Sequence, residues 1–197
     1  MNTTPATTHF SEITANPAPL GLLGFGMTTV LLNLHNAGCI ELSSMILSMG
    51  IFMGGLAQLI AGMQEWKKNN TFGATAFTAY GMFWLSLVGL ILLPNTSFAA
   101  NMKASANSMG WYLLLWGVFT FFMFIATLNS NTLLQVIFGT LTILFFLLAA
   151  SEFTGNETIK KIAGFEGIFC GLSAIYGTAA QVINEVHGKV ILPIGAK

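Results

Sequence analysis

The sequence predicts an all-α membrane protein in which six transmembrane helices form one bundle. Composition supports this: 54% of the residues are hydrophobic and only 7% are charged, whereas soluble domains carry about 25% charged residues. Arg and Asp do not occur at all, so charged side chains are too few to cover a surface that faces water on every side. In addition, six apolar stretches have the length of about 20 residues that a helix needs to cross a bilayer.

The predicted spans follow a polar N-terminal tail. They occupy residues 17–36, 42–63, 72–93, 109–128, 132–150 and 162–183. The first span begins at Pro17 and Pro19, because proline is tolerated in the first helical turn, and Asn16 is expected to be its N-cap. The breaks are short, so neighbouring spans run antiparallel and no loop holds a further domain. The predicted domains are a tail at 1–15, a transmembrane domain at 16–187 and a short C-terminal tail at 188–197.

Two spans carry stripes of small residues at helical spacing. These are Gly50, Gly54, Ala57 and Ala61 in the second span, and Gly167, Gly171 and Ala174 in the sixth. Small residues let helices approach closely in lipid, where the hydrophobic effect does not drive association. The stripes predict close packing, either between spans of one subunit or between subunits of an oligomer.

Candidate lining residues share helix faces inside the membrane. At about 100° per residue, one face of the first span aligns Phe25, Thr28, Thr29, Leu32 and Asn36, with Asn33 at its edge. The third span aligns Gly73, Phe77, Tyr80 and Trp84. The fifth span aligns Leu134, Leu141, Phe145 and Leu148. The second span adds one mid-membrane amide, Gln58. Polar groups in a membrane need partners or water. Hydrogen bonding between helices fits Thr28 and Thr29 as well as lining does, and both roles stay open for Gln58.

Several function classes lack the residues that they require. No Lys lies within a predicted span, so no buried cation is available to an anionic substrate. Glu166 is the one acid near mid-membrane, whereas Glu41, Glu65 and Glu185 are expected to be solvated at the interface. No metal-ligand, nucleophile–base or phosphate-binding motif is present, so we expect no metal, no cofactor and no enzymatic activity. The net charge of zero without clustered Lys or Arg argues against nucleic acid as a partner.

Residues 16–22, with the sequence NPAPLGL, resemble the signature of the acetate uptake transporter family. The likeness continues through residues 24–29, 32–36, 54–58, 70–73, 75–77, 80–81, 115–120 and 190–195. It covers nearly the whole chain and weakens in the polar tail, at 95–108 and at 151–161.

The resemblance implies a six-helix subunit in the inner (plasma) membrane, with cytoplasmic termini, surrounded by lipid and assembled as a homo-hexamer. Each subunit is expected to have its own path for acetate and related small carboxylates, with succinate as a possible substrate. The resemblance implies that this path works either as an anion channel or as a proton-coupled permease. In the family, Phe, Tyr and Leu form a narrow hydrophobic constriction, and they match Phe25, Tyr80 and Leu141 here. The candidate substrate-binding or lining residues are Thr28, Thr29, Asn33, Asn36, Gln58 and Trp84.

Without a buried cation, a carboxylate is expected to bind to neutral donors such as Thr, Asn, Gln, the Tyr hydroxyl and helix N-termini. Two other classes stay open. An ammonium or ammonia conduit would favour aromatic or His-lined cation sites in mid-span, whereas His9, His35 and His187 lie in the tail or at span ends. A membrane sensor or scaffold would need an exposed partner surface or a soluble module, which loops this short do not offer.

Overall fold

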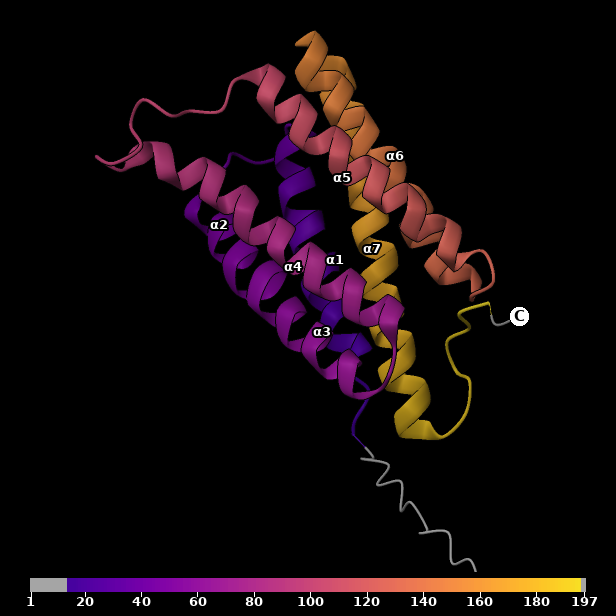
Figure 1. Cartoon of the computed structure of the whole chain (residues 1–197). Helices are drawn as coiled ribbons and strands as arrows, with labels where there is room; N and C mark the ends of the chain where they lie inside the picture. The colour runs from indigo at the N-terminus through magenta and orange to yellow at the C-terminus, as the bar shows by residue number, and fades with distance from the viewer. Residues whose placement is uncertain (1–13, 196–197) are drawn as a thin grey trace, which may run out of the picture.

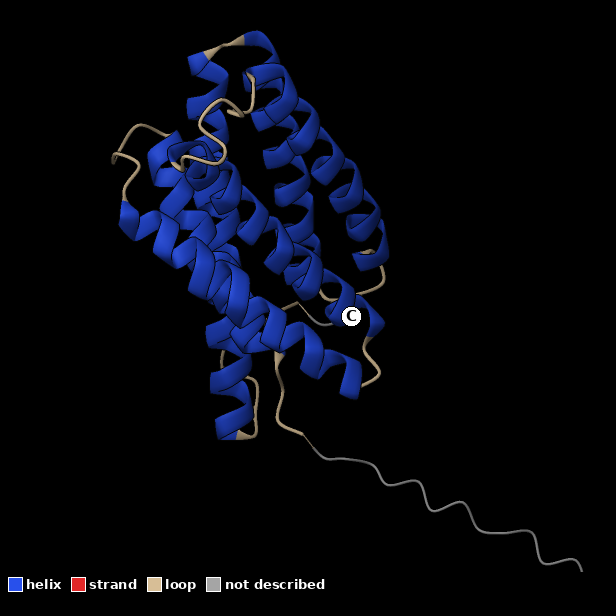
Figure 2. Ribbon diagram, turned by 60° about the vertical axis from the view of Figure 1, so that its left-hand side comes forward, coloured by secondary structure: helices blue, strands red, loops and turns tan. Residues whose placement is uncertain are grey.

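The computed structural model describes residues 14–195, and within them six helices are long and apolar enough to cross a membrane (Figure 1). Every regular element in this part of the chain is helical (Figure 2). The elements are α1 Ala18–Asn36, α2 Ser44–Met49, the π-helix η1 Gly50–Ala57, α3 Gln58–Lys67, α4 Thr71–Leu92, the short η2 Leu93–Asn95, α5 Ala106–Thr127, α6 Thr132–Thr154 and α7 Glu157–His187. The predicted all-α, six-span fold is confirmed. Of the tail predicted at 1–15, residues 1–13 lie outside the described part.

The first helix holds the bundle together. α1 packs along α7 and against η1 and α3, α4 packs on η1 and α3, and α6 lies between α5 and α7. The backbones of α4 and α5 lie farther apart, and the two helices meet through side chains such as Tyr80 and Thr120. They are joined by the loop at 96–105, which projects from the bundle (Figure 1). α2, η1 and α3 continue into one another as a single span. Because successive spans are antiparallel, α1, α4 and α6 all begin at the end of the bundle where the first and last described residues lie, which we call the termini end.

Both stripes of small residues are used inside the subunit. A Cβ added at Gly171 in α7 would lie 2.8 Å from the carbonyl oxygen of Gly26 in α1. A Cβ added at Gly54 in η1 would lie 2.6 Å from Cγ of Trp84 in α4. These close contacts decide whether the stripes pack spans within one subunit or pack subunits together, a choice that the sequence left open. The stripes join helices of one chain, and they supply no argument for an interface between subunits.

The break predicted at 151–161 is wrong. Only Gly155 and Asn156 separate α6 from α7, and the Asn156 side chain accepts hydrogen bonds from two backbone N–H groups in the first turn of α7. Lys160 and Lys161 therefore lie within the helix. The 31 residues of α7 span roughly 46 Å at ~1.5 Å per residue, more than the ~30 Å of a bilayer core. Counting apolar residues finds the part of a helix that lies in lipid and misses its polar ends.

Candidate functional site

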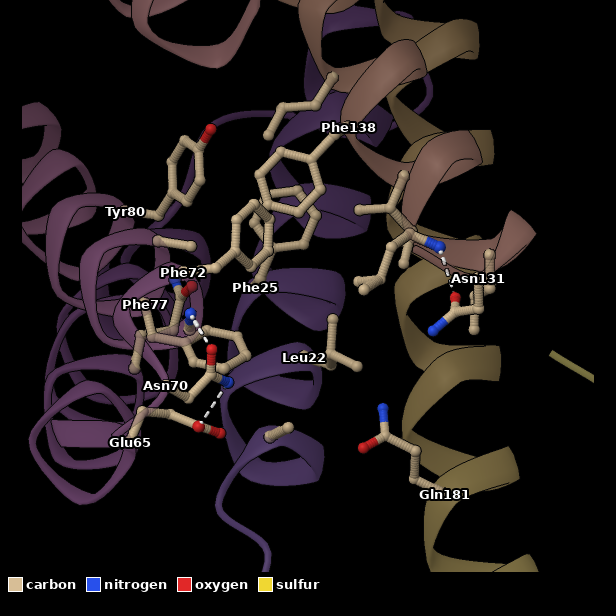
Figure 3. A pocket seen from close by; sticks show the side chains of 18 of the residues that line it. Leu22, Phe25, Glu65, Asn70, Phe72, Phe77, Tyr80, Asn131, Phe138 and Gln181 are labelled. Carbon is tan, nitrogen blue, oxygen red and sulfur yellow. Dashed lines mark hydrogen bonds between the residues drawn. The ribbon is translucent and has the colours of Figure 1, made fainter. Parts of the chain in front are cut away.

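A cavity of about 230 Å³ lies between α1, α3, α4, α6 and α7, and Figure 3 shows the side chains around it. We call it the first cavity. Four of its polar lining residues gather toward the termini end of the bundle, and these are Glu65, Asn70, Asn131 and Gln181, whereas Gln58 and Tyr80 line it deeper in. Deeper in, most of the wall is apolar and aromatic, with Leu22, Phe72, Phe77 and Phe138 among its residues. Since about 10–15 Å³ of such space holds one water, the first cavity has room for a small carboxylate together with several waters.

A second, much smaller cavity follows farther along α1, α4 and α6. It measures about 30 Å³ and is lined by Thr29, Leu32 and Asn33 of α1, Phe83 and Trp84 of α4, and Leu144, Phe145 and Leu148 of α6, besides the residues that it shares with the first. By the same measure it has room for only about two or three waters.

The two cavities have three lining residues in common, and these are Phe25, Tyr80 and Leu141. They come from α1, α4 and α6 respectively, and all three are buried. The ring centroids of Phe25 and Tyr80 lie 6.1 Å apart, with the ring planes inclined by 50°. The wall between the cavities is therefore apolar and is built by three helices that are distant in the sequence.

The hydroxyl group of Tyr80 is occupied by the protein itself. It donates a hydrogen bond of 3.0 Å to Oγ1 of Thr120 in α5, and Thr120 in turn donates to the carbonyl oxygen of Trp116 at 2.7 Å. This chain fixes the orientation of the Tyr80 ring. The phenol has only one hydrogen to donate, so in this geometry Tyr80 gives its hydroxyl hydrogen to Thr120 and presents its ring to the cavities.

Gln58 lines the first cavity from the start of α3 and is 0% exposed. Its Nε2 donates to the carbonyl oxygen of Gly54 at 2.7 Å, whereas its Oε1 has no hydrogen-bond partner among the described residues. The accepting carbonyl belongs to η1, and that π-helix was not predicted. π-Turns are rare and often occur at functional sites. Here η1 leads directly into the residue that faces the cavity.

The polar residues of α1 divide into two groups. Thr29 and Asn33 line the second cavity, where Asn33 Nδ2 donates to the carbonyl oxygen of Thr29 at 2.9 Å. Thr28 and Asn36 line neither cavity. The Thr28 hydroxyl donates to the carbonyl oxygen of Gly24 at 2.6 Å, and Asn36 Nδ2 donates to Oδ1 of Asn33 at 3.0 Å. Thr28 thus closes a hydrogen bond within its own helix, and Asn36 supports the Asn33 amide.

Trp84 is buried in the wall of the second cavity, with its ring over Gly54. Its indole N–H finds no acceptor in the described part of the chain. It is a ready donor for a solute or a water, because a buried N–H without a partner costs about 1–3 kcal/mol.

Glu65 is the main lining residue that the sequence reasoning missed. It was expected to be solvated, but only 2% of it is exposed, and it lines the first cavity. Its Oε2 accepts a hydrogen bond of 2.7 Å from Nδ2 of Asn70, drawn dashed in Figure 3. The tight turn between α3 and α4 covers this end of the span. The available signal was the spacing from Gln58, which places both side chains on one face. Glu166 lines neither cavity, and its carboxylate oxygens lack partners among the described residues.

Three helix N-termini meet at the mouth of the first cavity. The side chain of Asn70 accepts from the backbone N–H of Gly73 at the start of α4, and that of Asn131 accepts from Leu134 at the start of α6. At α1 the N-cap residue is Pro17 rather than Asn16. Asn16 Oδ1 still accepts from the N–H of Ala18 at 3.2 Å, and Nδ2 donates to Gln181. Helix N-termini carry partial positive charge, so the backbone supplies the field that missing cations would otherwise provide.

The C-terminal segment completes the wall of the first cavity. The backbone N–H groups of Thr132 and Leu133 donate to the carbonyl oxygens of Gly195 and Ile194, at 2.9 and 3.1 Å, and Ile194 lines the first cavity. Farther back, Oδ1 of Asn184 accepts from the N–H groups of two residues of this segment. Residues 191–195 are therefore docked along α7 and onto the start of α6.

A family model described as the GPR1/FUN34/yaaH family matches residues 1–194. The chain belongs to this family. Within the GPR1/FUN34/yaaH family it is 55% identical to the succinate-acetate/proton symporter SatP of Escherichia coli (strain K12), over 181 residues that cover 92% of this chain and 95% of that protein. The resemblance to acetate uptake transporters is confirmed.

A solved structure and a yeast protein are also similar to this chain. A solved structure of the bacterial acetate channel SatP matches it with a TM-score of 0.90 and 54% identity, covering 92% of this chain and 99% of that one. The ammonia transport outward protein 2 of Saccharomyces cerevisiae is 35% identical over 184 residues, which cover 90% of this chain and 65% of the yeast protein.

Proposed function

We propose that this protein carries acetate and related small carboxylates, succinate among them, across the membrane through a path inside each subunit. One observation carries the proposal. Two cavities follow one another along α1, α4 and α6, and they share only Phe25, Tyr80 and Leu141. The names of the bacterial relatives, which are a succinate-acetate/proton symporter and an acetate channel, support the same substrate class. They also favour transport over catalysis.

The physical chemistry of the site suits a small monocarboxylate. Such an acid, with a pKa near ~4, is almost wholly anionic at pH 7. The anion enters a cavity where three helix N-termini and neutral amides replace part of its hydration. Beyond the constriction, the Trp84 N–H and the amide of Asn33 offer the next donors. Binding by neutral groups is weak, which permits rapid exit from each site.

The constriction itself selects by size and polarity. In the proposed path, Phe25, Tyr80 and Leu141 pinch the passage between the cavities, and the methyl group of acetate slides past their apolar surfaces. A hydrophobic ring of this kind also dewets, which hinders water and inorganic ions.

The proposal includes the assembly and the orientation of the protein. We place it as a homo-hexamer in the inner (plasma) membrane, with cytoplasmic termini, as the family resemblance implies. Its outer faces carry many exposed apolar side chains, including Phe122, Leu115 and Phe169. These faces suit contact with lipid and with neighbouring subunits.

An ammonium conduit is the second candidate, and Glu65 is the observation that favours it. A buried carboxylate in a cavity with aromatic walls attracts cations, and the yeast relative is named for ammonia transport. Against it, the first cavity receives three helix N-termini, whose partial charge favours anions. Uptake of radiolabelled methylammonium and of acetate, measured in the same vesicles, separates the two substrates.

The proposed function is tested with liposomes that contain only this protein. We expect radiolabelled acetate to enter them faster than it enters protein-free liposomes or liposomes with the Leu141→Trp variant, in which the larger ring fills the constriction. Running the assay with and without a pH gradient then distinguishes a proton-coupled permease from an anion channel. Equal uptake in all three preparations would contradict acetate transport.

A further inference from the structure

We propose that the first cavity takes up one proton with each carboxylate that it binds, and that this proton is held between the Glu65 carboxyl group and the substrate. The inference rests on the proposed transport of carboxylates, and it names the residue through which substrate binding depends on protons.

Glu65 is built into the wall of the first cavity. It is 2% exposed, and Asn70 Nδ2 donates to its Oε2 at 2.7 Å. A Cβ added at Gly73 would lie 2.9 Å from Cδ of Glu65, so the carboxyl group lies beside the first turn of α4. The start of α4 carries partial positive charge. In the empty cavity, therefore, the Glu65 carboxyl group is held by Asn70 and lies against the start of α4.

No positive charge in the wall offsets a second carboxylate. Among the described residues that line the cavity, Glu65 and Tyr80 are the only ionisable ones, and the Tyr80 hydroxyl donates to Thr120. The lining residues from α1, α6 and α7 are all uncharged. The nearest charged groups in the sequence, Lys67 and Lys68, follow Glu65 at the same end of α3, but both are exposed and neither lines the cavity. The ionisable groups at the end of α7, Glu185 and His187, are exposed as well and do not line the cavity.

A carboxylate substrate in this cavity therefore meets a second carboxylate. Two carboxylates that share one site do not both stay ionised, and the pair holds a proton. Here the proton comes from the aqueous phase at the mouth of the cavity. One carboxyl oxygen donates its O–H to an oxygen of the other group, in a charge-assisted hydrogen bond. The proton belongs to the pair rather than to either member.

This coupling has a measurable consequence. If binding takes up one proton, the rate of uptake at limiting acetate falls up to tenfold for each unit by which the pH rises. In Glu65→Gln, the amide oxygen still accepts from Asn70, and the NH₂ group donates to the substrate without a proton from water. The variant is expected to transport acetate with less than a twofold change between pH 5.5 and 7.5.

We would measure initial rates of acetate uptake into proteoliposomes at equal internal and external pH, after subtracting the rate of protein-free liposomes. Glu185→Gln, which changes an exposed acid at the same end of the bundle, is the matched control and is expected to keep the wild-type slope. A Glu65→Gln variant that retains that slope would overturn the inference, because the proton would then enter elsewhere or on neutral acetic acid. Absence of acetate uptake in the wild type at every pH would instead remove the proposed function.

A second measurement needs no variant. Trifluoroacetic acid is much stronger than acetic acid, so its neutral form is too rare to carry the flux, and any pH dependence of trifluoroacetate uptake must come from the protein. We expect uptake of trifluoroacetate by the wild-type protein to fall with rising pH as steeply as that of acetate. Uptake that does not change with pH would overturn the shared proton even if Glu65→Gln fails to fold.

Discussion

Two buried residues along the proposed path, Gln58 and Trp84, each have one polar atom without a hydrogen-bond partner in the described part of the chain. Gln58 gives one amide hydrogen to Gly54 and keeps its Oε1 without a partner among the described residues, and Trp84 keeps its indole N–H free in the same sense. Each such group costs about 1–3 kcal/mol when buried. The cost disappears when water or a passing carboxylate supplies the partner, which suits groups that must exchange partners during transport.

Trp84→Phe removes the indole N–H while keeping an aromatic ring over Gly54. We expect the initial rate of acetate uptake into proteoliposomes to fall several-fold, because the second cavity loses its unpaired donor. Trp66→Phe changes a Trp that is 59% exposed and should leave the rate unchanged. A wild-type rate in Trp84→Phe would assign this Trp to packing alone.

Gln58→Leu keeps a side chain of similar size but removes the amide group, which in the proposed path replaces part of the solute's hydration shell. Acetate uptake should drop by roughly tenfold, which corresponds to about 1.4 kcal/mol, the value of one ordinary hydrogen bond. The variant should elute from a sizing column like the wild-type protein, which shows that folding is intact. If its uptake equals that of the wild type, Gln58 has a structural role only.

At the scale of helices, the sequence predicts the features that depend on the length of an apolar stretch, which are the number and position of the spans. Six stretches of about 20 apolar residues located all six spans, because hydrocarbon demands that length. The same count missed the polar turns of α7 and the π-turns of η1, since neither changes hydrophobicity. It also misplaced Glu65, whose burial depends on the tight turn into α4 rather than on its own residue type.

Close packing between α1 and α7 depends on glycine at the crossing. Gly171→Ala would place a Cβ 2.8 Å from the carbonyl oxygen of Gly26, and backbone cannot move aside as a flexible side chain does. We expect a loss of about 1–3 kcal/mol in stability, seen as a lower melting temperature in detergent. Gly89→Ala makes the same change where nothing lies within 4 Å, and it should not lower the melting temperature. Equal melting temperatures for the two variants would contradict this packing.

The whole molecule brings together residues that the sequence keeps far apart. Helical phase alone placed Phe25, Tyr80 and Leu141 on faces that packing explains equally well, and only the resemblance selected them as a set. The structure adds that they line both cavities. Such a meeting of three helices depends on tertiary packing, which single-span patterns do not encode.

Assembly is the second prediction at this scale. Native mass spectrometry in mild detergent should show a homo-hexamer. Since both stripes of small residues are used within the subunit, the interface must come from the exposed apolar faces instead. A monomer in several mild detergents would count against the hexamer.

The central claim is that Phe25, Tyr80 and Leu141 form a constriction in a path for small carboxylates. If they do, side-chain volume at these positions governs which acids pass. Leu141→Ala and Phe25→Ala should then admit lactate, which is bulkier, relative to acetate. If the three residues are only packed core, truncation instead costs about 2–5 kcal/mol of stability at each site and leaves selectivity as it was.

The most direct test is the ratio of lactate to acetate uptake in proteoliposomes of the wild type, Leu141→Ala and Phe25→Ala, with the melting temperature of each protein measured alongside. We predict that the ratio rises several-fold in both truncations. An unchanged ratio in both variants, with lower melting temperatures, would contradict the constriction.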